Sequence, residues 1–342
     1  MIEITNVYYL PSGRVFVGKT EDGYKIEFTE MRDVSVDGKL HANVREETET
    51  SKIWPHLVSY EDKWLLTVST QKGCSFNCKF CDVAPLDFKG NLTSNEIAEQ
   101  IQLLLANTLY VKKSNKVKIG FARMGEPAIN LYNVLYVIKN LDIISERLER
   151  DFKWLPCFNS ILPRNCGNGI TGQDVIREVI NIKENDYNGY LHFQISCNST
   201  DENIRKQLFG GANVLTLEEI IDEINKYNIT NRTVTLNFIV MKDIPVDVNH
   251  LMKLGLNPEK FTVKLIPLNK TNNAQKNNLE TYANYSNYED LVKLAEQFEY
   301  NGIPVVYDAI AKCEEAGLCC GQLVNANKWG NYVWKKANIY YY

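Results

Sequence analysis

The sequence predicts an α/β protein, a partial (β/α)6 barrel with a small N-terminal β extension. From Trp64 onward, short apolar runs typical of buried strands alternate with amphipathic segments typical of helices, about six times in succession. Strands that alternate with helices along a chain form a parallel sheet covered by those helices. Before Trp64, alternating runs separated by turn residues indicate hairpins instead.

The first 60 residues are expected to form a small β unit followed by a linker. Glu21-Asp22-Gly23 lies between alternating apolar residues, which is a strong hairpin signal. The polar segment Met31–Lys52 is predicted to be loop. We therefore divide the chain into a β unit and linker (1–60), a barrel domain (61–325) and an aromatic tail (326–342). The N-terminal strands are predicted at Val7–Leu10, Arg14–Lys19 and Tyr24–Phe28.

The barrel domain supplies the predicted helices and strands in alternation. Capping boxes open three of the helices, at Thr93-x-x-Glu96, Thr216-x-x-Glu219 and Ser286-x-x-Glu289. A polar loop is expected over Asn269–Ser286. The predicted strands are Trp64–Thr70, Val117–Ala122, Trp154–Asn159, Tyr190–Ser196, Thr233–Val240, Phe261–Pro267 and Ile303–Tyr307. The predicted helices are Ser94–Leu105, Leu131–Leu141, Gly172–Ile182, one from Glu202, Leu217–Tyr227, Val246–Leu254 and Tyr288–Tyr300.

Composition excludes some classes of function. The chain has 342 residues, 44% of them hydrophobic and 23% charged, with a net charge of −4, which argues against a strongly basic nucleic-acid binder. No apolar run reaches the roughly 18 residues of a membrane span, and no signal peptide opens the chain, so we expect no membrane partner. The nine cysteines are then expected to be mostly reduced, in the cytoplasm.

Three cysteines, Cys74, Cys78 and Cys81, lie at the spacing CxxxCxxC just after the first barrel strand. Three thiolates on one loop can hold three irons of a [4Fe–4S] cluster and leave the fourth iron open. An open iron is what S-adenosylmethionine (SAM) chelates in enzymes that make a 5′-deoxyadenosyl radical. The alternatives are a zinc site or scattered buried thiols, but zinc requires a fourth ligand, and no CxxC or HxxxH partner lies nearby.

Four motifs together resemble a known family. They are Ser69-Thr70-Gln71-Lys72-Gly73-Cys74 leading into the cysteine motif, Met124-Gly125-Glu126-Pro127, Leu265-Ile266-Pro267-Leu268-Asn269, and Cys320-Gly321-Gln322-Leu323. In this order and spacing, the chain from about residue 10 to residue 325 resembles the RlmN/Cfr type of radical SAM methyltransferase. That family methylates an adenine carbon, C2 or C8, in ribosomal RNA and in some members transfer RNA. The motifs also follow predicted strand ends, where barrel sites lie.

The resemblance implies a chemistry. In the family, one SAM methylates the cysteine that matches Cys320, and a second SAM yields the radical that takes a hydrogen from this S-methyl group. The resulting radical adds to the adenine carbon, and a second cysteine resolves the crosslink as a disulfide forms. A reactive, exposed thiol is required. The implied cofactors are a [4Fe–4S] cluster and SAM, the implied substrate is RNA or a nucleotide, and the implied reducing partner is a protein such as flavodoxin or ferredoxin.

The resemblance also assigns roles to residues. Cys74, Cys78 and Cys81 match the cluster ligands, and Cys320 matches the methyl carrier. Glu27 matches a glutamate that the family places at the substrate base; its alternative reading is an exposed hairpin residue. A carboxylate suits the ammonium group of SAM, as Glu126 would supply. The positions that match SAM-binding residues are Gly125, Glu126, Ser196, Cys197, Asn198 and Asn269.

Several positions depart from the family pattern. The resolving cysteine of the family is replaced by Thr67, Cys157 stands in place of a SAM-contacting serine, and the family's N-terminal helical domain is missing from this sequence. Cys313 and Cys319 are additional thiols near Cys320. Cys319, Cys313 or Cys157 resolves the crosslink, or the substrate needs no thiol for this step, or the chain performs different radical chemistry. An auxiliary cluster on Cys313, Cys319 and Cys320 is a fourth possibility.

The sequence therefore predicts a radical SAM enzyme that transfers a methyl or methylene group through Cys320 to an sp2 carbon of a purine. The alternative is direct attack of the deoxyadenosyl radical on a small molecule or nucleotide, without a methylated cysteine. A hypothesis from another class is a binding protein with a catalytically silent cluster. The C-terminal aromatic residues, from Trp329 to Tyr342, are interpreted as a packed tail or partner contact rather than as a platform for bases.

Overall fold

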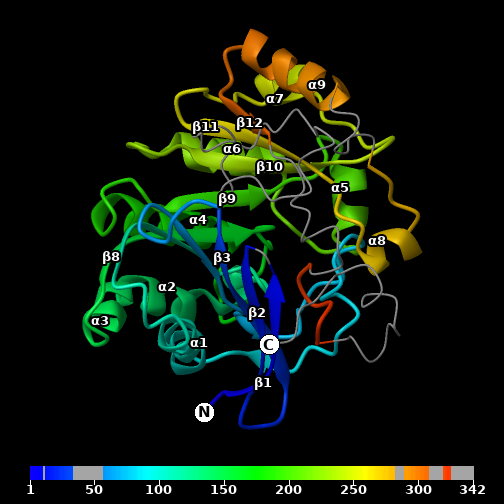
Figure 1. The fold of residues 1–342 in the computed structure, drawn as a ribbon. Coiled ribbons are helices and arrows are strands. Elements are labelled where there is room, and N and C mark those ends of the chain that lie inside the picture. Colours follow the sequence, from blue (N-terminus) through cyan, green and yellow to red (C-terminus); the bar gives the residue numbers. More distant parts are fainter. Residues whose placement is uncertain (11, 34–56, 282–288, 308–318, 325–342) are drawn as a thin grey trace, which may run out of the picture.

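One mixed sheet organises the molecule. In the computed structural model, residues 1–10, 12–33, 57–281, 289–307 and 319–324 are described. Their main sheet has ten strands in the order β1-β2-β3-β4-β7-β8-β9-β10-β11-β12. The sheet curves through the centre of the molecule without closing, and helices lie along its outer side (Figure 1). The predicted class, a partial barrel with an N-terminal β extension, is confirmed.

The parallel part of the sheet contains the strands that were predicted from Trp64 onward. Every neighbouring pair from β4 to β12 is parallel. Because parallel strands end at the same edge, the loops that follow them meet there. The strands are β4 (Trp64–Thr67), β7 (Lys113–Gly120), β8 (Asp151–Ser160), β9 (His192–Ser196), β10 (Val234–Val240), β11 (Phe261–Pro267) and β12 (Val305–Tyr307).

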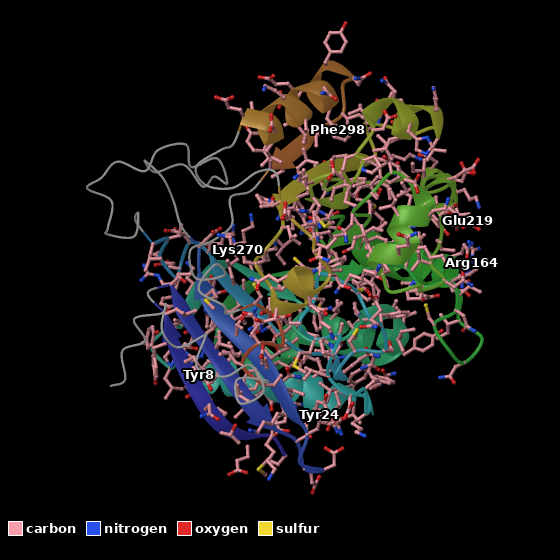
Figure 2. The ribbon with its side chains drawn as sticks, turned by 90° about the vertical axis from the view of Figure 1, so that its right-hand side faces the viewer. Tyr8, Tyr24, Arg164, Glu219, Lys270 and Phe298 are labelled. Carbon is pink, nitrogen blue, oxygen red and sulfur yellow. The ribbon has the colours of Figure 1, made fainter. Side chains whose placement is uncertain are left out.

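The N-terminal strands extend the same sheet. β1 (Glu3–Leu10), β2 (Gly13–Lys19) and β3 (Lys25–Arg32) form an antiparallel meander, and β3 pairs antiparallel with β4. In Figure 2, Tyr8 and Tyr24 mark these strands, and Phe298 marks the helix at the opposite end of the sheet. The division of the chain at residue 60 remains a prediction.

Helices cover the outer face of the sheet, and their apolar sides complete the main hydrophobic core. That core includes Trp64 and Ile119 from strands and Ile101, Val179 and Phe298 from helices. None of the described helices combines the length and apolar character needed to cross a membrane. The helices are α1 (Ser94–Ala106), α2 (Leu131–Lys139), α3 (Leu141–Glu146), α4 (Gly172–Asn185), α5 (Glu202–Leu208), α6 (Leu217–Asn225), α7 (Val248–Lys253), α8 (Asn272–Lys276) and α9 (Glu289–Tyr300).

The structure differs from the predicted elements in three places. Strands β5 (Gln71–Lys72) and β6 (Gly90–Asn91) form a small hairpin-like pair that frames the cysteine loop. The helix predicted at Leu131–Leu141 is followed directly by a second helix, α3. The predicted polar loop over Asn269–Ser286 contains α8, whose N-cap Thr271 accepts a hydrogen bond from Ala274 N through its side chain. Capping boxes at Thr93 and Thr216 are confirmed.

Candidate active site

The cysteine loop is anchored by two other segments of the chain. Asn273 Nδ2 donates hydrogen bonds to Cys78 O (2.9 Å) and Cys81 O (3.1 Å), and Lys79 N donates to Leu208 O (2.8 Å). Helix α8 and the end of α5 therefore fix the backbone from which the three thiols project. This support was not visible in the sequence, because residues 79, 208 and 273 are far apart along the chain.

The three thiols lie close enough to influence each other. Burial raises the pKa of Cys74 to about 12, and it raises the pKa values of Cys78 and Cys81 as well, with further contributions from the neighbouring thiols. All three are free thiols. Among the described residues, no three His, Cys, Asp or Glu side chains converge on a single metal ion. An iron–sulfur cluster would supply the positive charge that the crowded thiolates need.

Gly125 and Glu126 lie beside this loop, just after β7. Gly125 has a φ of +101°, and an added Cβ would lie 2.6 Å from the side chain of Gln71. Gln71 in turn accepts a hydrogen bond from Glu126 N at 2.9 Å. The close approach and the positive φ both require glycine here. The motif thus places the Glu126 backbone against the strand that leads into the cysteine loop.

The Glu126 carboxylate is buried without a cationic partner among the described residues. It accepts hydrogen bonds from Ala128 N (3.0 Å) and Ile161 N (3.1 Å). Burial raises the pKa of Glu126 to about 7, although these hydrogen bonds oppose the shift. A ligand cation would favour the charged form. The site therefore fits the ammonium group of SAM.

Three asparagines, one just after β9, one within β10 and one just after β11, carry unsatisfied buried atoms. They are Asn198 Nδ2, Asn237 Oδ1 and Asn269 Oδ1. Asn198 adopts a left-handed backbone with φ +63°, and its Oδ1 accepts a hydrogen bond from Ile239 N at 3.1 Å. Buried polar atoms are normally paired, so this edge of the sheet fits a polar ligand. Asn198 and Asn269 were predicted from the motifs, whereas Asn237 was not.

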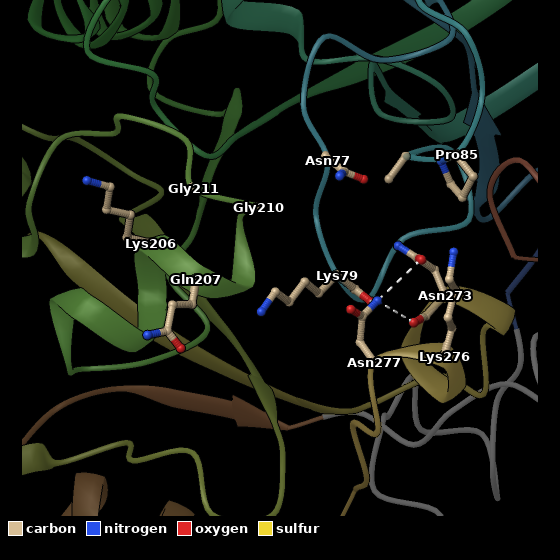
Figure 3. A pocket seen from close by; sticks show the side chains of 11 residues that line it. Asn77, Lys79, Pro85, Lys206, Gln207, Gly210, Gly211, Asn273, Lys276 and Asn277 are labelled. Carbon is tan, nitrogen blue, oxygen red and sulfur yellow. Dashed lines mark hydrogen bonds between the residues drawn. The ribbon is translucent and has the colours of Figure 1, made fainter.

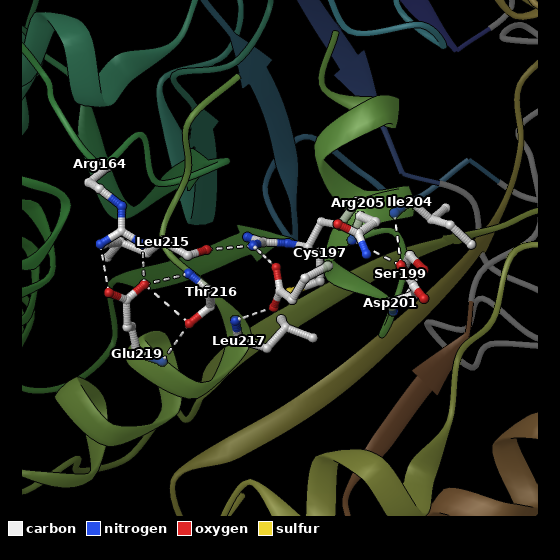
Figure 4. Close-up of polar contacts among 12 residues, drawn as sticks. Arg164, Cys197, Ser199, Asp201, Ile204, Arg205, Leu215, Thr216, Leu217 and Glu219 are labelled. Carbon is white, nitrogen blue, oxygen red and sulfur yellow. Dashed lines mark hydrogen bonds and ion pairs between the residues drawn. The ribbon is translucent and has the colours of Figure 1, made fainter. Parts of the chain in front are cut away.

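Ser196 and Cys197 end up in different environments. Ser196 is partly exposed, whereas Cys197 is fully buried in the main core, with burial raising its pKa to about 12. Helix α5, which follows β9, is held by the buried side chain of Arg205, which donates hydrogen bonds to Leu215 O and to Glu202 Oε2 (Figure 4). Nearby, Arg164 forms an ion pair with Glu219. Ser196 and Asn198 therefore face the strand-end site, and Cys197 points away from it.

Glu27 is the anchor of the segment that carries Cys320. Its fully buried carboxylate accepts hydrogen bonds from Gly321 N (3.0 Å), Leu323 N (2.9 Å) and Val324 N (3.0 Å). The exposed-hairpin interpretation of Glu27 is therefore wrong. Leu323 packs with Tyr8, Val15 and Val17, which covers the second face of the N-terminal strands. These contacts hold the backbone around Cys320.

Arg123 joins Glu27 to the thiol. Its Nη2 lies 2.7 Å from Glu27 Oε2, and its Nη1 lies 3.7 Å from Cys320 Sγ. Burial disfavours the charged guanidinium, but Glu27 and the thiols of Cys320 and Cys319 outweigh it and raise the pKa of Arg123. Cys320 itself is partly exposed, while Cys319 is buried. Arg123 was missed from the sequence, although an arginine directly before the motif at Met124-Gly125-Glu126 was a visible signal.

One carboxylate connects the Cys320 segment to the cysteine loop. Asp82, next to Cys81, accepts hydrogen bonds from Gln322 Nε2 (2.6 Å), Asn273 N (2.7 Å) and Asn272 N (3.0 Å). The backbone of Gly321 also packs against Val83. Residues 320–323 therefore contact Asp82 and Val83, which directly follow the cysteine motif. Cys313 and the aromatic tail lie outside the described residues.

Thr67 and Cys157, the two departures from the family pattern, lie at the same level of the sheet. Thr67 pairs in register with Gly120, which pairs with Cys157 on the next strand. Thr67 is hydrogen-bonded to Thr29. Cys157 Sγ lies 3.6 Å from His192 Nδ1. Only a glycine separates the two positions, so no side chain stands between them.

A basic hollow lies on the outer side of the cysteine loop. It has a volume of about 680 Å³, and Figure 3 shows Lys79, Lys206 and Lys276 around it, with Asn277 bonded to the backbone of Lys79. None of these three lysines forms an ion pair with another described residue. The hollow borders Asn77 and Lys79, which lie between the predicted cluster ligands.

The sequence is similar to proteins named as RNA methyltransferases. The chain is 29% identical over 203 residues to a protein of Chlorobaculum tepidum named probable dual-specificity RNA methyltransferase RlmN, covering 58% of the chain and 50% of that protein. It is 30% identical over 212 residues to a protein of the same name from Thermosipho melanesiensis, covering 60% and 55%. The chain thus spans about half the length of these relatives. No family model matches the sequence.

The fold matches a solved structure along most of the chain. A radical SAM methyltransferase from Sphaerobacter thermophilus superposes with a TM-score of 0.64 at 16% identity, covering 94% of this chain and 80% of that one. The fold of the chain is therefore similar to that of a radical SAM methyltransferase. In sequence, the chain is similar to proteins named as RlmN methyltransferases over about half of their length.

Proposed function

We propose that the protein transfers a methyl or methylene group through Cys320 to an sp2 carbon of a purine, most simply an adenine in RNA. The observation that supports this most strongly is the contact between the Cys320 segment and the cysteine loop, through Gln322 and Asp82 at 2.6 Å. A thiol that first accepts a methyl group and then gives up a hydrogen must lie next to the source of the radical. That requirement favours the arrangement described above.

In this proposal, Cys74, Cys78 and Cys81 hold a [4Fe–4S] cluster, which supplies the electron for SAM cleavage when it is bound. Glu126 pairs with the SAM ammonium group, and Asn198, Asn237 and Asn269 satisfy its remaining polar groups. Glu27 is a positioning residue, because it holds the Cys320 backbone. The thiolates must stay reduced, so the proposal includes a reducing, intracellular environment.

Arg123 gives Cys320 a cationic neighbour. A guanidinium 3.7 Å from the sulfur favours the thiolate, which is the nucleophilic form. In the proposed first step, the Cys320 thiolate attacks the methyl carbon of SAM. The S–CH3 bond forms as the methyl–sulfonium bond breaks, and S-adenosylhomocysteine leaves with the electron pair.

The test is the mass of the Cys320 peptide after the cluster-loaded protein has been incubated with methyl-deuterated SAM. We expect a gain of one CD3 group on Cys320 in the wild-type protein and in Cys319→Ala, and none in Cys320→Ala. An unlabelled Cys320 in protein that still converts SAM to 5′-deoxyadenosine would contradict the proposal. Protein that releases no 5′-deoxyadenosine under strong reductant would instead support a silent binding protein.

A second candidate function is direct attack of the radical on a small substrate, and Thr67 favours it. A threonine cannot form the disulfide that releases the product in the family mechanism. Its hydroxyl is already hydrogen-bonded to Thr29. Deuterium transfer from a labelled substrate into 5′-deoxyadenosine, with Cys320 unmodified, would distinguish this reaction from methyl transfer.

The electron donor is the remaining partner, and the basic hollow is our proposal for where it docks. Lys79, Lys206 and Lys276 suit the acidic surface of an electron carrier such as flavodoxin or ferredoxin. We expect Lys206→Glu and Lys276→Glu to slow protein-driven activation and to leave activation by dithionite unchanged, with Lys139→Glu on α2 as the control. Equal slowing with both reductants would contradict this docking site.

A further inference from the structure

Cys319 places a second thiol directly beside the proposed methyl carrier. Cys319 and Cys320 are neighbours in the chain, and both are free thiols in the structure. Cys320 is partly exposed, whereas Cys319 is buried. The function proposed above gives Cys319 no role, so we ask whether its surroundings allow it to act on the neighbouring sulfur.

The two cysteines lie in a tight turn whose backbone is held from both sides. Gln322 N donates to Cys319 O at 3.2 Å, which closes the turn, and Gly321 takes the positive φ, +83°, that such a turn requires. The Gln322 side chain accepts a hydrogen bond from Cys319 N (2.9 Å) and donates one to Asp82. The backbone of both cysteines is therefore fixed, and their sulfur atoms move only by side-chain rotation.

A single guanidinium serves both thiols. Arg123 Nη1 lies 3.7 Å from Cys320 Sγ, and Arg123 Nη2 lies 3.5 Å from Cys319 O. Burial opposes the charged guanidinium, but Glu27 and the two thiolates outweigh it and raise the pKa of Arg123. Each sulfur therefore lies within electrostatic reach of the guanidinium. Because a nearby cation favours the thiolate, which is the form that attacks other sulfur atoms, both neighbours can be nucleophiles.

The other groups that could act on Cys320 are arranged differently. The Thr67 hydroxyl is hydrogen-bonded to Thr29 and cannot form a disulfide. The Cys157 thiol donates to the carbonyl two residues earlier in its own strand, and its Sγ lies 3.6 Å from His192 Nδ1. Cys313 lies outside the described residues. Within the part of the chain that the structure describes, Cys319 is thus the thiol that shares a turn and a cation with Cys320.

We propose that Cys319 is the nucleophile that frees the Cys320 sulfur from an attached group, by forming a disulfide between the two neighbours. In the proposed reaction this group is the methylene that joins Cys320 to the purine, so its identity rests on the proposed function. The Cys319 thiolate attacks Cys320 Sγ, the S–S bond forms and the S–CH2 bond breaks. The electron pair of the broken bond passes to the methylene carbon and the purine ring, and a proton from water completes the methyl group.

The position of the two cysteines also explains how the site is reset. Their peptide bond is trans, so their Cα atoms lie about 3.8 Å apart, closer than the roughly 4.4–6.8 Å that most disulfides span. A disulfide between them is strained, and strained disulfides are easily reduced. A dithiol supplies the two electrons and two protons and becomes a disulfide itself. Strain also opposes formation of the bond, so release through Cys319 can still be accelerated by a thiol at position 67.

The test is a model reaction on the Cys320 sulfur that needs no purine. Cluster-loaded protein without SAM is incubated anaerobically with glutathione disulfide and quenched with acid, and the mass of the peptide that contains Cys320 is measured over time. Glutathione forms a mixed disulfide with Cys320, and we expect Cys319 to displace it, which leaves the peptide two hydrogens lighter than the dithiol. In Cys319→Ala, the glutathione adduct should persist at least about tenfold longer, because an intramolecular attack has been lost.

Matched variants separate this role from a structural one. The contacts described above involve the backbone of residue 319, so Cys319→Ala retains them and should melt at the temperature of the wild type. Cys166→Ala removes another buried thiol, one that donates to Pro163 O, and should release glutathione at the wild-type rate. Cys157→Ala and Cys313→Ala remove the rival thiols, and we expect the wild-type rate in both.

Equal lifetimes of the glutathione adduct in the wild type and in Cys319→Ala would overturn the inference, as would a disulfide that joins Cys320 to Cys157 or to Cys313. Labelling of Cys320 from deuterated SAM needs no second thiol and tests the proposed function separately. Rapid release of glutathione without such labelling would contradict methyl transfer and leave Cys319 as the redox partner of Cys320.

Discussion

Replacing Glu27 with glutamine is predicted to release the Cys320 segment while the rest of the protein stays folded. The carboxylate accepts three backbone hydrogen bonds from residues 321–324 and pairs with Arg123 at 2.7 Å. A glutamine has the same size, but it removes the negative charge that faces buried Arg123 and offers one acceptor oxygen instead of two.

The magnitude follows from these contacts. Removing one partner of a buried ion pair costs about 3–5 kcal/mol. If this cost falls on the segment that Glu27 holds, its opening becomes about 10²- to 4 × 10³-fold more frequent, since each 1.4 kcal/mol is a factor of about ten. Methylation of Cys320 should then slow strongly, whereas SAM cleavage to 5′-deoxyadenosine should change little.

Amide hydrogen exchange of the peptide that contains residues 319–324 measures the opening directly. The matched control is Glu30→Gln on the same strand. Glu30 is also buried in an ion pair, with Arg14 at 2.7 Å, but it contacts Trp64 rather than the Cys320 segment. Equal exchange of residues 319–324 in the two variants would refute the reasoning, because the effect would then reflect general destabilisation.

Three further predictions concern the neighbouring positions. Gly125→Ala should abolish SAM binding measured by equilibrium dialysis, because its Cβ would lie 2.6 Å from the side chain of Gln71. The control is Gly211→Ala, which has φ +84° and open space around it, and which should leave SAM binding intact and cost only about 1–2 kcal/mol of backbone strain. Equal SAM binding by both variants would contradict this prediction. Because burial raises the pKa of Glu126 to about 7, the folded protein holds the proton of this carboxyl more tightly than the unfolded chain does. The free energy of unfolding of the cluster-free protein, measured by urea titration, should therefore fall as the pH rises from about 4.5 to 7. The variant Glu126→Gln should not show that fall. Thr67→Cys should accelerate product release after a single turnover if a crosslink forms at Cys320, and an unchanged rate would favour direct radical attack.

The sequence was informative where local patterns decide the structure. Capping boxes at Thr93 and Thr216 located helix starts, and the apolar run Phe261–Pro267 located a strand to the residue. Helix α8 was missed, because Thr271-Asn272-Asn273 has no apolar periodicity, and its start is held by Asp82 from 190 residues away. Such a helix depends on tertiary contacts rather than on propensity.

The same distinction applies to the candidate site. Motif spacing identified residues that lie on loops at one edge of the sheet, because parallel strands bring their ends together whatever the intervening sequence. It could not reveal that Glu27 is buried, since alternation on an edge hairpin normally places such a residue in solvent, and here Leu323 covers that face. Nor could it pair Arg123 with Glu27, 96 residues apart.

The position of Asp82 has a mechanical consequence. This single carboxylate receives hydrogen bonds from the segment that carries Cys320 and from helix α8, which lines the outer hollow. It follows Cys81 directly, so it joins the cysteine loop to both of these segments. In the proposed function, the basic hollow where an electron donor would dock and the Cys320 thiol that would carry the methyl group are therefore both connected to Asp82. The loop that would hold the cluster and the segment that would carry the methyl group are, in that function, linked through one carboxylate.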